Sequence, residues 1–232
     1  MNERKYQLLQ DIVEEYIKTA EPVSSKLIAQ MVDFDVSPAT IRNEMAELED
    51  EGLLMHPHTS AGRIPTQLGY RFYVQHFLKP QEPSAQKRQT LAHAIGSSDA
   101  LEHCFKKFAK ELAEMIEYTV LVGFDSQTFY YTGVSFLFRQ PEFKEGSDWI
   151  QFGDMIDHLD QVMHDLYDQV PNDPTFYIGS QNPFSDQLSL LACRNMFKES
   201  HQSDSVPFIG ILGPLRMDYN KVMGAAKAMQ EL

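Results

Sequence analysis

The chain has 232 residues, and 43% of them are hydrophobic, so it can bury a substantial core and is not a disordered tail. Its formal net charge of −13 is unusual for a protein that binds nucleic acid and argues against a generally basic binding surface. The charged residues 1–10 lack the apolar centre of a signal peptide, and no apolar run reaches the roughly 18 residues of a membrane span, so we expect a cytoplasmic protein.

Three helices are predicted at the start of the chain. Apolar residues recur at helical spacing over residues 3–19 and 25–31. A third helix is predicted over residues 38–51, because Ser37 is a good N-cap and Pro38 suits the first helical position. Three helices of these lengths with short turns between them are typical of a tri-helical DNA-binding core.

The third helix has an inward and an outward side. Ile41, Met45 and Leu48 share one face and are predicted to pack inward. The first turns otherwise carry small, polar or cationic side chains, and a helix-turn-helix protein reads base edges with that part of its recognition helix. These side chains are Ala39, Thr40, Arg42 and Asn43.

A short hairpin is predicted next, with residues 59–63 at its tip, which is typical of a winged helix. Residues 1–79 carry a net charge of −4, so binding to phosphates depends on local clustering of cations. We expect Lys26, Arg42, Arg63 and Arg71 to cluster. Periodicity alone leaves open a small helical bundle that binds no DNA.

Two stretches carry a resemblance to a known family. SPATIRNEMAELEDEGLL (37–54) and PHTSAGRIPTQLGYRFYV (57–74) resemble the signature of the heat-inducible transcription repressor family, HrcA. The resemblance implies base contacts from Ser37, Ala39, Thr40, Arg42 and Asn43. It also implies wing and backbone contacts from His58, Thr59, Ser60 and Arg63, with Lys26 and Arg71 on phosphates.

The rest of the chain changes from helical to mixed patterning. The two prolines and the Gly-Ser-Ser of residues 80–99 predict a linker with a short helix, between a DNA-binding domain over 1–79 and a second domain over 100–232. Strands interspersed with helices predict an α+β domain, with an antiparallel sheet and helices packed on it. The predicted helices are 67–78, 100–117, 149–170 and 218–231, and the predicted strands are 119–124, 129–138, 175–179, 188–197 and 207–212.

Few residues of the second domain suggest chemistry. Asp157, Asp160, His164 and Asp168 form a polar stripe that could hold a divalent cation, but we interpret it as the solvated back of an amphipathic helix. The two cysteines, 104 and 193, have neither a disulfide framework nor metal spacing and are expected to be buried thiols. No catalytic motif is present, so we expect neither an enzyme nor a cofactor.

The second domain extends the resemblance. Gly133 followed by QPEF (140–143), IGSQN (178–182) and GPLRMDY (213–219) are similar to segments of the same family, whose regulatory region is GAF-like. The chain passes almost directly from TVLVGF (119–124) to FYYTGVSF (129–136). It therefore resembles a short member that lacks the family's inserted dimerisation domain.

The resemblance implies a repressor of chaperone operons that binds an inverted-repeat operator as a dimer and is released on heat stress. It also implies a dependence on the GroE chaperonin. We expect the two protomers of the dimer to contact each other through helix 67–78 or helix 100–117. The alternatives are a repressor that senses a small molecule through its GAF-like domain, and an interaction module that has lost DNA binding.

Overall fold

The computed structural model describes residues 3–31, 37–57, 62–96, 101–143, 153, 155–194 and 207–231. The chain divides into two units, Met1–Leu78 and Lys79–Leu232. No helix within the described ranges is long and apolar enough to cross a membrane.

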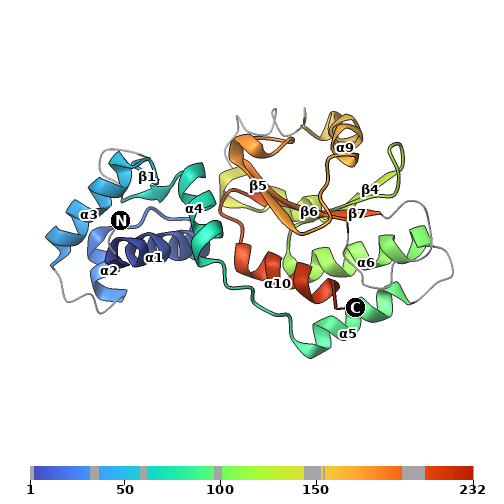
Figure 1. The fold of residues 1–232 in the computed structure, drawn as a ribbon, viewed down its shortest axis with the longest axis horizontal. Coiled ribbons are helices and arrows are strands. Elements are labelled where there is room, and N and C mark those ends of the chain that lie inside the picture. The colour runs from blue at the N-terminus through green and yellow to red at the C-terminus, as the bar shows by residue number, and fades with distance from the viewer. Residues whose placement is uncertain are drawn as a thin grey trace. The chain divides into compact units, whose positions relative to one another are not determined.

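Unit 1 is a helical core with a two-stranded antiparallel sheet (Figure 1). Its first helix buries Leu8, Leu9, Ile12 and Val13, and its third buries Ile41, Met45 and Leu48, as the periodicity predicts. The elements are α1 (Glu3–Thr19), α2 (Ser25–Met31), α3 (Pro38–Asp50), β1 (Leu54–Met55), β2 (Ile64–Pro65) and α4 (Gln67–Phe77).

Unit 2 is built on a five-stranded antiparallel sheet in the order β4-β3-β7-β6-β5. The strands are β3 (Thr119–Gly123), β4 (Phe129–Thr132), β5 (Thr175–Ile178), β6 (Leu188–Cys193) and β7 (Phe208–Pro214). The helices are α5 (Ala85–Ile95), α6 (Leu101–Ile116), α7 (Val134–Phe138), α9 (Leu159–Tyr167) and α10 (Tyr219–Met229), with 3-10 turns η1 (Pro141–Phe143) and η2 (Gly179–Gln181). The α+β class with an antiparallel sheet is confirmed.

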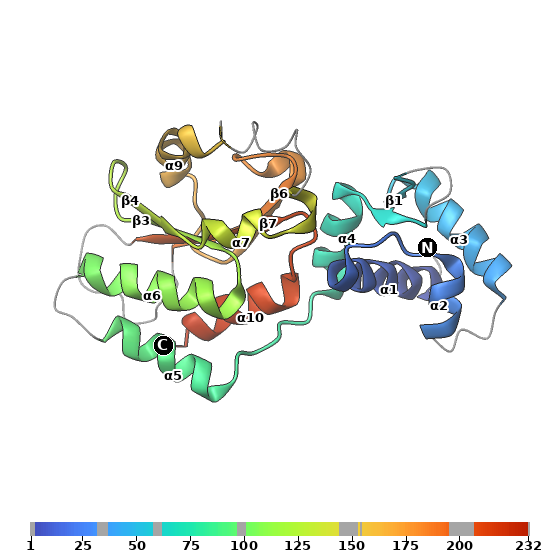
Figure 2. The same cartoon turned by 180° about the vertical axis from the view of Figure 1, so that it is seen from behind.

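Helices cover both faces of this sheet. Figure 2 shows α6 and α10 on one face, with α5 beyond them, and α9 on the other. Every residue of β3, β6 and β7 is buried. These strands therefore appear in the sequence as continuous apolar runs, because a strand enclosed on both faces has no solvated side to carry polar residues.

The prediction of a strand over residues 129–138 is wrong beyond Thr132. Gly133 has a φ of +77° and leads into the short helix α7, which buries Leu137. A Cβ at Gly133 would lie 2.7 Å from the carbonyl oxygen of Tyr118, so a residue with a side chain is excluded there on two grounds. The hairpin of β3 and β4 is confirmed, with Gly123 opposite Phe129.

Two other expectations differ in extent. The segment expected to be a linker with a short helix, residues 80–99, does contain a helix, α5, but this helix packs against α6 and α10 within unit 2. The helix expected over 149–170 is described as α9 and its flanks, and residues 149–152 and 154 lie outside the described residues.

Candidate nucleic-acid interface

The first turn of α3 is held by its own cap. Ser37 lies in extended backbone, and its hydroxyl oxygen accepts a hydrogen bond from the backbone N–H of Thr40 at 3.2 Å. The two hydroxyl groups lie 3.1 Å apart. Pro38 occupies the start of the helix, where its missing N–H costs nothing. Ser37 and Thr40, which are also predicted to contact bases, thus fix the conformation of the first turn of α3.

Four of the five predicted base-reading residues are exposed to solvent. These are Ser37, Ala39, Arg42 and Asn43, while Thr40 is half-buried. The helix therefore has an open N-terminal surface, as expected for contact with base edges. The structure brings these residues together within two turns of one element.

The rest of α3 is acidic, and α1 neutralises much of that charge. Glu44 is buried and forms an ion pair with Arg4, whose Nε lies 2.8 Å from Glu44 Oε1. Lys5 Nζ lies 2.5 Å from Glu47 Oε2 and 3.2 Å from Glu51 Oε1. Lys5 donates hydrogen bonds to Glu47 and Glu51, and these bonds raise the pKa of Lys5, so it stays protonated beside them. These three carboxylates of α3 and its C-terminal end would otherwise repel DNA phosphates, and they are paired instead with cations of α1.

Glu49 connects α3 to both strands of the wing. Arg63 Nη2 lies 2.8 Å from Glu49 Oε2, and His56 Nδ1 lies 2.9 Å from the other carboxylate oxygen. The Arg63 side chain is 13% exposed. The guanidinium of Arg63, the residue before β2, is thus held against the recognition helix.

The backbone around Arg63 is held as firmly as its side chain. The N–H and C=O groups of Arg63 pair with those of Val23 at 2.8 Å each. Gly62 permits this approach, since a Cβ there would lie 2.3 Å from the carbonyl oxygen of Val23. Arg63 therefore lies at the junction of the wing, the segment before α2 and α3.

The other predicted contacts are more scattered. Lys26 is exposed on α2, and Arg71 is half-buried on α4, where its Nε donates to the carbonyl oxygen of Gln67 at 3.3 Å. The helix α4 lies on the other side of α1 and β1 from α2 and α3 (Figures 1 and 2). Arg71 is therefore not grouped with Arg42. The predicted wing residues His58, Thr59 and Ser60 lie outside the described residues.

Sequence reasoning missed the ion pairs from α1 and the wing to α3. Arg4 and Glu44 are separated by 40 positions, so no local spacing indicates their contact. A weak signal was available, because the first turn of α1 holds two cations, Arg4 and Lys5, and α3 holds four acidic residues. Complementary charge of that kind favours contact but does not identify partners.

In unit 2, polar contacts join segments that are distant in sequence. Arg216 Nη2 donates to Gln140 Oε1 at 2.9 Å and to Glu142 Oε2 at 3.1 Å. Asp218 caps α10 by accepting from the N–H of Lys221 at 2.9 Å. The described residues contain no group of three or more His, Cys, Asp and Glu that could hold a metal ion. Both cysteines are buried, and neither is in a disulfide.

Comparison with known proteins relates both units to one family. A family model described as "Winged helix-turn-helix transcription repressor, HrcA DNA-binding" matches residues 1–76, and one described as "HrcA protein C terminal domain" matches residues 75–223. A protein of Natranaerobius thermophilus named heat-inducible transcription repressor HrcA is 46% identical over 127 residues, which is 53% of this chain and 36% of that protein. Its namesake in Shouchella clausii is 44% identical over 123 residues, with 53% and 36% covered.

In these matches the chain spans little more than a third of the length of the curated relatives. A solved crystal structure, described as that of a hypothetical protein, superposes with a TM-score of 0.71 over 100% of this chain and 97% of that one. Its sequence identity is 19%, so this likeness shows the fold alone.

Proposed function

Because the chain belongs to the HrcA family of heat-inducible transcription repressors, we propose that it represses chaperone operons by binding an inverted-repeat operator as a dimer. Heat stress releases it from the operator, and the GroE chaperonin maintains its active fold. This function places the protein in the cytoplasm, where the operators are. A DNA-binding winged-helix domain is part of the family assignment.

The open N-terminal face of α3 is the observation that supports operator binding best. Ala39, Arg42 and Asn43 are exposed there, while Glu44 is buried under Arg4. A chain of net charge −13 approaches DNA only if its contact surface is locally free of negative potential. The internal ion pairs of α3 reduce that potential beside the reading face.

We assign base reading to Ser37, Ala39, Thr40, Arg42 and Asn43, and wing or phosphate contacts to Lys26, His58, Thr59, Ser60, Arg63 and Arg71. Arg63 acts mainly by positioning the wing, because its guanidinium is bound to Glu49 and is largely buried. Arg71 contacts phosphate from α4, away from the reading helix.

A dimer is proposed because one winged helix reads a few base pairs, and a two-fold operator requires two-fold protein symmetry. Of the two surfaces favoured from sequence, the apolar stripe of α6 is buried within unit 2. The aromatic helix α4 keeps apolar surface: Leu68 is 49% exposed, and Phe72 stacks on His76 with ring centroids 4.1 Å apart. We therefore favour α4 for the contact between protomers.

The test is a mobility-shift assay with the promoter of the cell's own chaperonin operon, at several salt concentrations and temperatures. We expect a retarded complex whose log affinity falls linearly with log salt, with a slope of about −0.9 per phosphate contact. A mutated inverted repeat is the matched control. Equal affinity for both DNAs, or no dependence on salt, would refute operator binding.

The second candidate is a repressor that responds to a small molecule bound by unit 2. The observation that favours it is a pocket of about 220 Å³ in that unit. Thermal shift against a metabolite set separates the two candidates. A ligand that raises the melting temperature and also changes operator affinity would support the second, whereas heat release without any ligand supports the first.

A further inference from the structure

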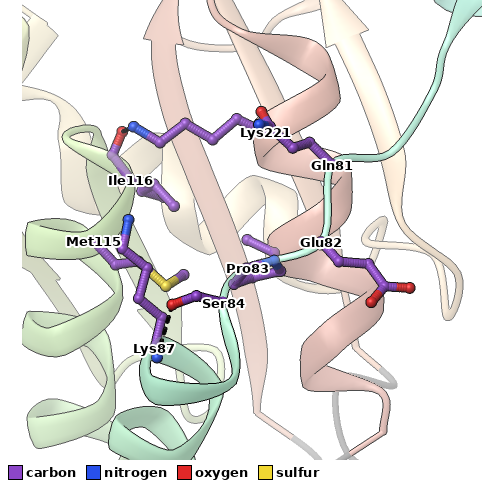
Figure 3. Close-up of a pocket in the computed structure, with 9 residues that line it drawn as sticks. Gln81, Glu82, Pro83, Ser84, Lys87, Met115, Ile116 and Lys221 are labelled. Carbon is purple, nitrogen blue, oxygen red and sulfur yellow. Dashed lines mark hydrogen bonds between the residues drawn. The ribbon is translucent and has the colours of Figure 1, made fainter.

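A pocket lies where the segment before α5 crosses the ends of α6 and α10 (Figure 3). Its volume is about 220 Å³, which suits a ligand smaller than a typical drug. All of its walls belong to unit 2. The lining residues are Gln81, Glu82, Pro83, Ser84, Lys87, Met115, Ile116, Lys221 and Ala225.

Two lysines give the pocket a cationic side. Lys221 crosses from α10 toward α6, and its Nζ donates to the carbonyl oxygen of Ile116 at 2.9 Å (Figure 3). Lys87 extends from α5 toward the same end of α6. Burial lowers the pKa of Lys221, the charges of Glu117 and Asp218 raise it, and the positive charge of Lys87 lowers it to a smaller extent.

Acidic groups act on Lys221 rather than on Lys87: the charges of Glu117 and Asp218 both raise the pKa of Lys221. Glu117 Oε2 lies 3.8 Å from Lys221 Nζ, but the Glu117 side chain is 71% exposed, so solvent screens that pair. Glu82 pairs with Arg88 at 3.4 Å. Among the described residues, the Lys87 ammonium has no ion-pair partner.

The N-terminus of α5 adds to the same potential. Ser84 caps this 11-residue helix by accepting from the N–H of Lys87 at 3.4 Å, and it lines the pocket (Figure 3). Free N–H groups and the helix dipole at this end favour negative charge. The opposite walls are apolar, from Pro83, Met115 and Ala225. The pocket thus combines a cationic edge with an apolar wall.

We propose that this pocket binds a small organic anion, with a phosphate or carboxylate head between Lys87 and Lys221 and a short apolar body against Met115 and Ala225. The head of the anion pairs with both ammonium groups that line the pocket and gives Lys87 the counter-charge that it lacks among the described residues. Its body removes apolar surface from water, which an inorganic ion does not do.

Such a ligand also reinforces the attachment of the chain segment that follows unit 1. The N–H of Lys79 donates to Asn220 Oδ1 at 2.7 Å, and that of Gln81 donates to the carbonyl oxygen of Asn220 at 2.9 Å. The bound anion contacts residues 81–84 and α10 together. Binding therefore stabilises the folded state of unit 2 by mass action.

The experiment is a thermal-shift and calorimetric titration of the full chain at constant ionic strength. The probes are phenyl phosphate, benzoate and inorganic phosphate, with benzyl alcohol as the neutral analogue. We expect phenyl phosphate or benzoate to raise the melting temperature by about 5–10 °C at 100 times its Kd, and inorganic phosphate to bind more weakly. The ratio of the Kd values of phenyl phosphate and benzoate identifies whether the site prefers a phosphate or a carboxylate head group.

Lys87→Met should weaken binding of the organic anion about tenfold or more, because it removes one charge-assisted contact. Lys110→Met is the matched control: it deletes an exposed lysine of α6 that does not line the pocket and should leave the Kd unchanged. Lys87 is exposed, so its variant is expected to fold. Absence of binding by both organic anions, or equal binding by the two variants, overturns the proposal. Operator binding is measured separately and does not decide this result.

Discussion

Arg63 and Glu49 connect the wing to the recognition helix through an ion pair of 2.8 Å in which the arginine side chain is 13% exposed. Neither residue is at the reading face of α3. Their pairing fixes the angle between a strand and a helix that approach DNA together. A residue that positions a neighbour in this way affects binding without touching the ligand.

Glu49→Gln should therefore destabilise the protein by about 1–3 kcal/mol, because it leaves a largely buried guanidinium without its counter-charge. Urea denaturation measures this cost. Glu82→Gln is the control, because the pair of Glu82 with Arg88 is exposed and should change the stability by less than about 0.5 kcal/mol.

Operator affinity should also fall in Glu49→Gln and in Arg63→Met, and the double variant should lose less than the sum of the two. If only the Arg63 variant weakens operator binding, Arg63 contacts DNA directly and the positioning role is wrong.

Arg42→Ala should cost about 1–3 kcal/mol of operator binding and reduce discrimination at one base position, because an exposed arginine in the first turns of α3 can pair with guanine. Lys26→Ala should instead weaken binding equally on all sequences and reduce the salt slope by about one. Fluorescence anisotropy with the operator and its single-base variants measures both effects. An unchanged affinity for Arg42→Ala removes it from the interface, and Lys110→Ala on α6 provides the control.

The thiol of Cys193 should make the protein sensitive to alkaline pH. Burial, with a smaller contribution from the charge of Asp173, raises its pKa from 9.0 to about 12. The folded state therefore keeps a proton that the unfolded chain loses, and stability present below pH 9 is lost as the pH rises toward 12. The loss is about 1.4 kcal/mol per pH unit in that window.

Urea denaturation between pH 9 and 10 should thus show a smaller loss of stability in Cys193→Ala than in the parent. Tyr118→Phe is the control, because burial raises the pKa of Tyr118 from 10.0 to about 12 and its own contribution begins above pH 10. A Cys193 variant whose stability declines as steeply as that of the parent would exclude this explanation.

The same thiol reports on heat release. Cys193 is fully buried at the end of β6, so it should not react with iodoacetamide while unit 2 is folded. In a Cys104→Ala background, we expect its labelling to accelerate over the temperature range in which the operator is released. Release at temperatures where the thiol stays protected would show that unit 2 does not act by unfolding.

Gly224→Ala should loosen the segment before α5. A Cβ at Gly224 would lie 1.9 Å from the carbonyl oxygen of Gln81, so the segment or α10 must move, at a cost of about 1–3 kcal/mol or more. Hydrogen exchange of the Gln81 amide, which donates to Asn220, should accelerate. Gly96→Ala is the control, since its Cβ would meet Ala92 at an ordinary 3.7 Å.

The sequence by itself determined the elements whose signals are local. Helices α1 and α2 begin and end where the periodicity and the turn residues predict, because caps and an apolar stripe act within a few residues. The signature segments likewise indicated the winged helix. The strand predicted through Gly133 ended early, since a backbone that passes close to Tyr118 requires a positive φ that β-propensity does not report.

The tertiary structure alone decided which charges meet. Arg4 and Glu44 form one ion pair, Arg63 and Glu49 form another, and Lys87 and Lys221 line one pocket. The members of these pairs are separated by 14 to 134 positions, so their proximity depends on how the elements pack. Charge acts through distance in space, whereas periodicity acts through distance along the chain. For that reason the reading helix was evident in the sequence, and the pairs that neutralise its acidic side were not.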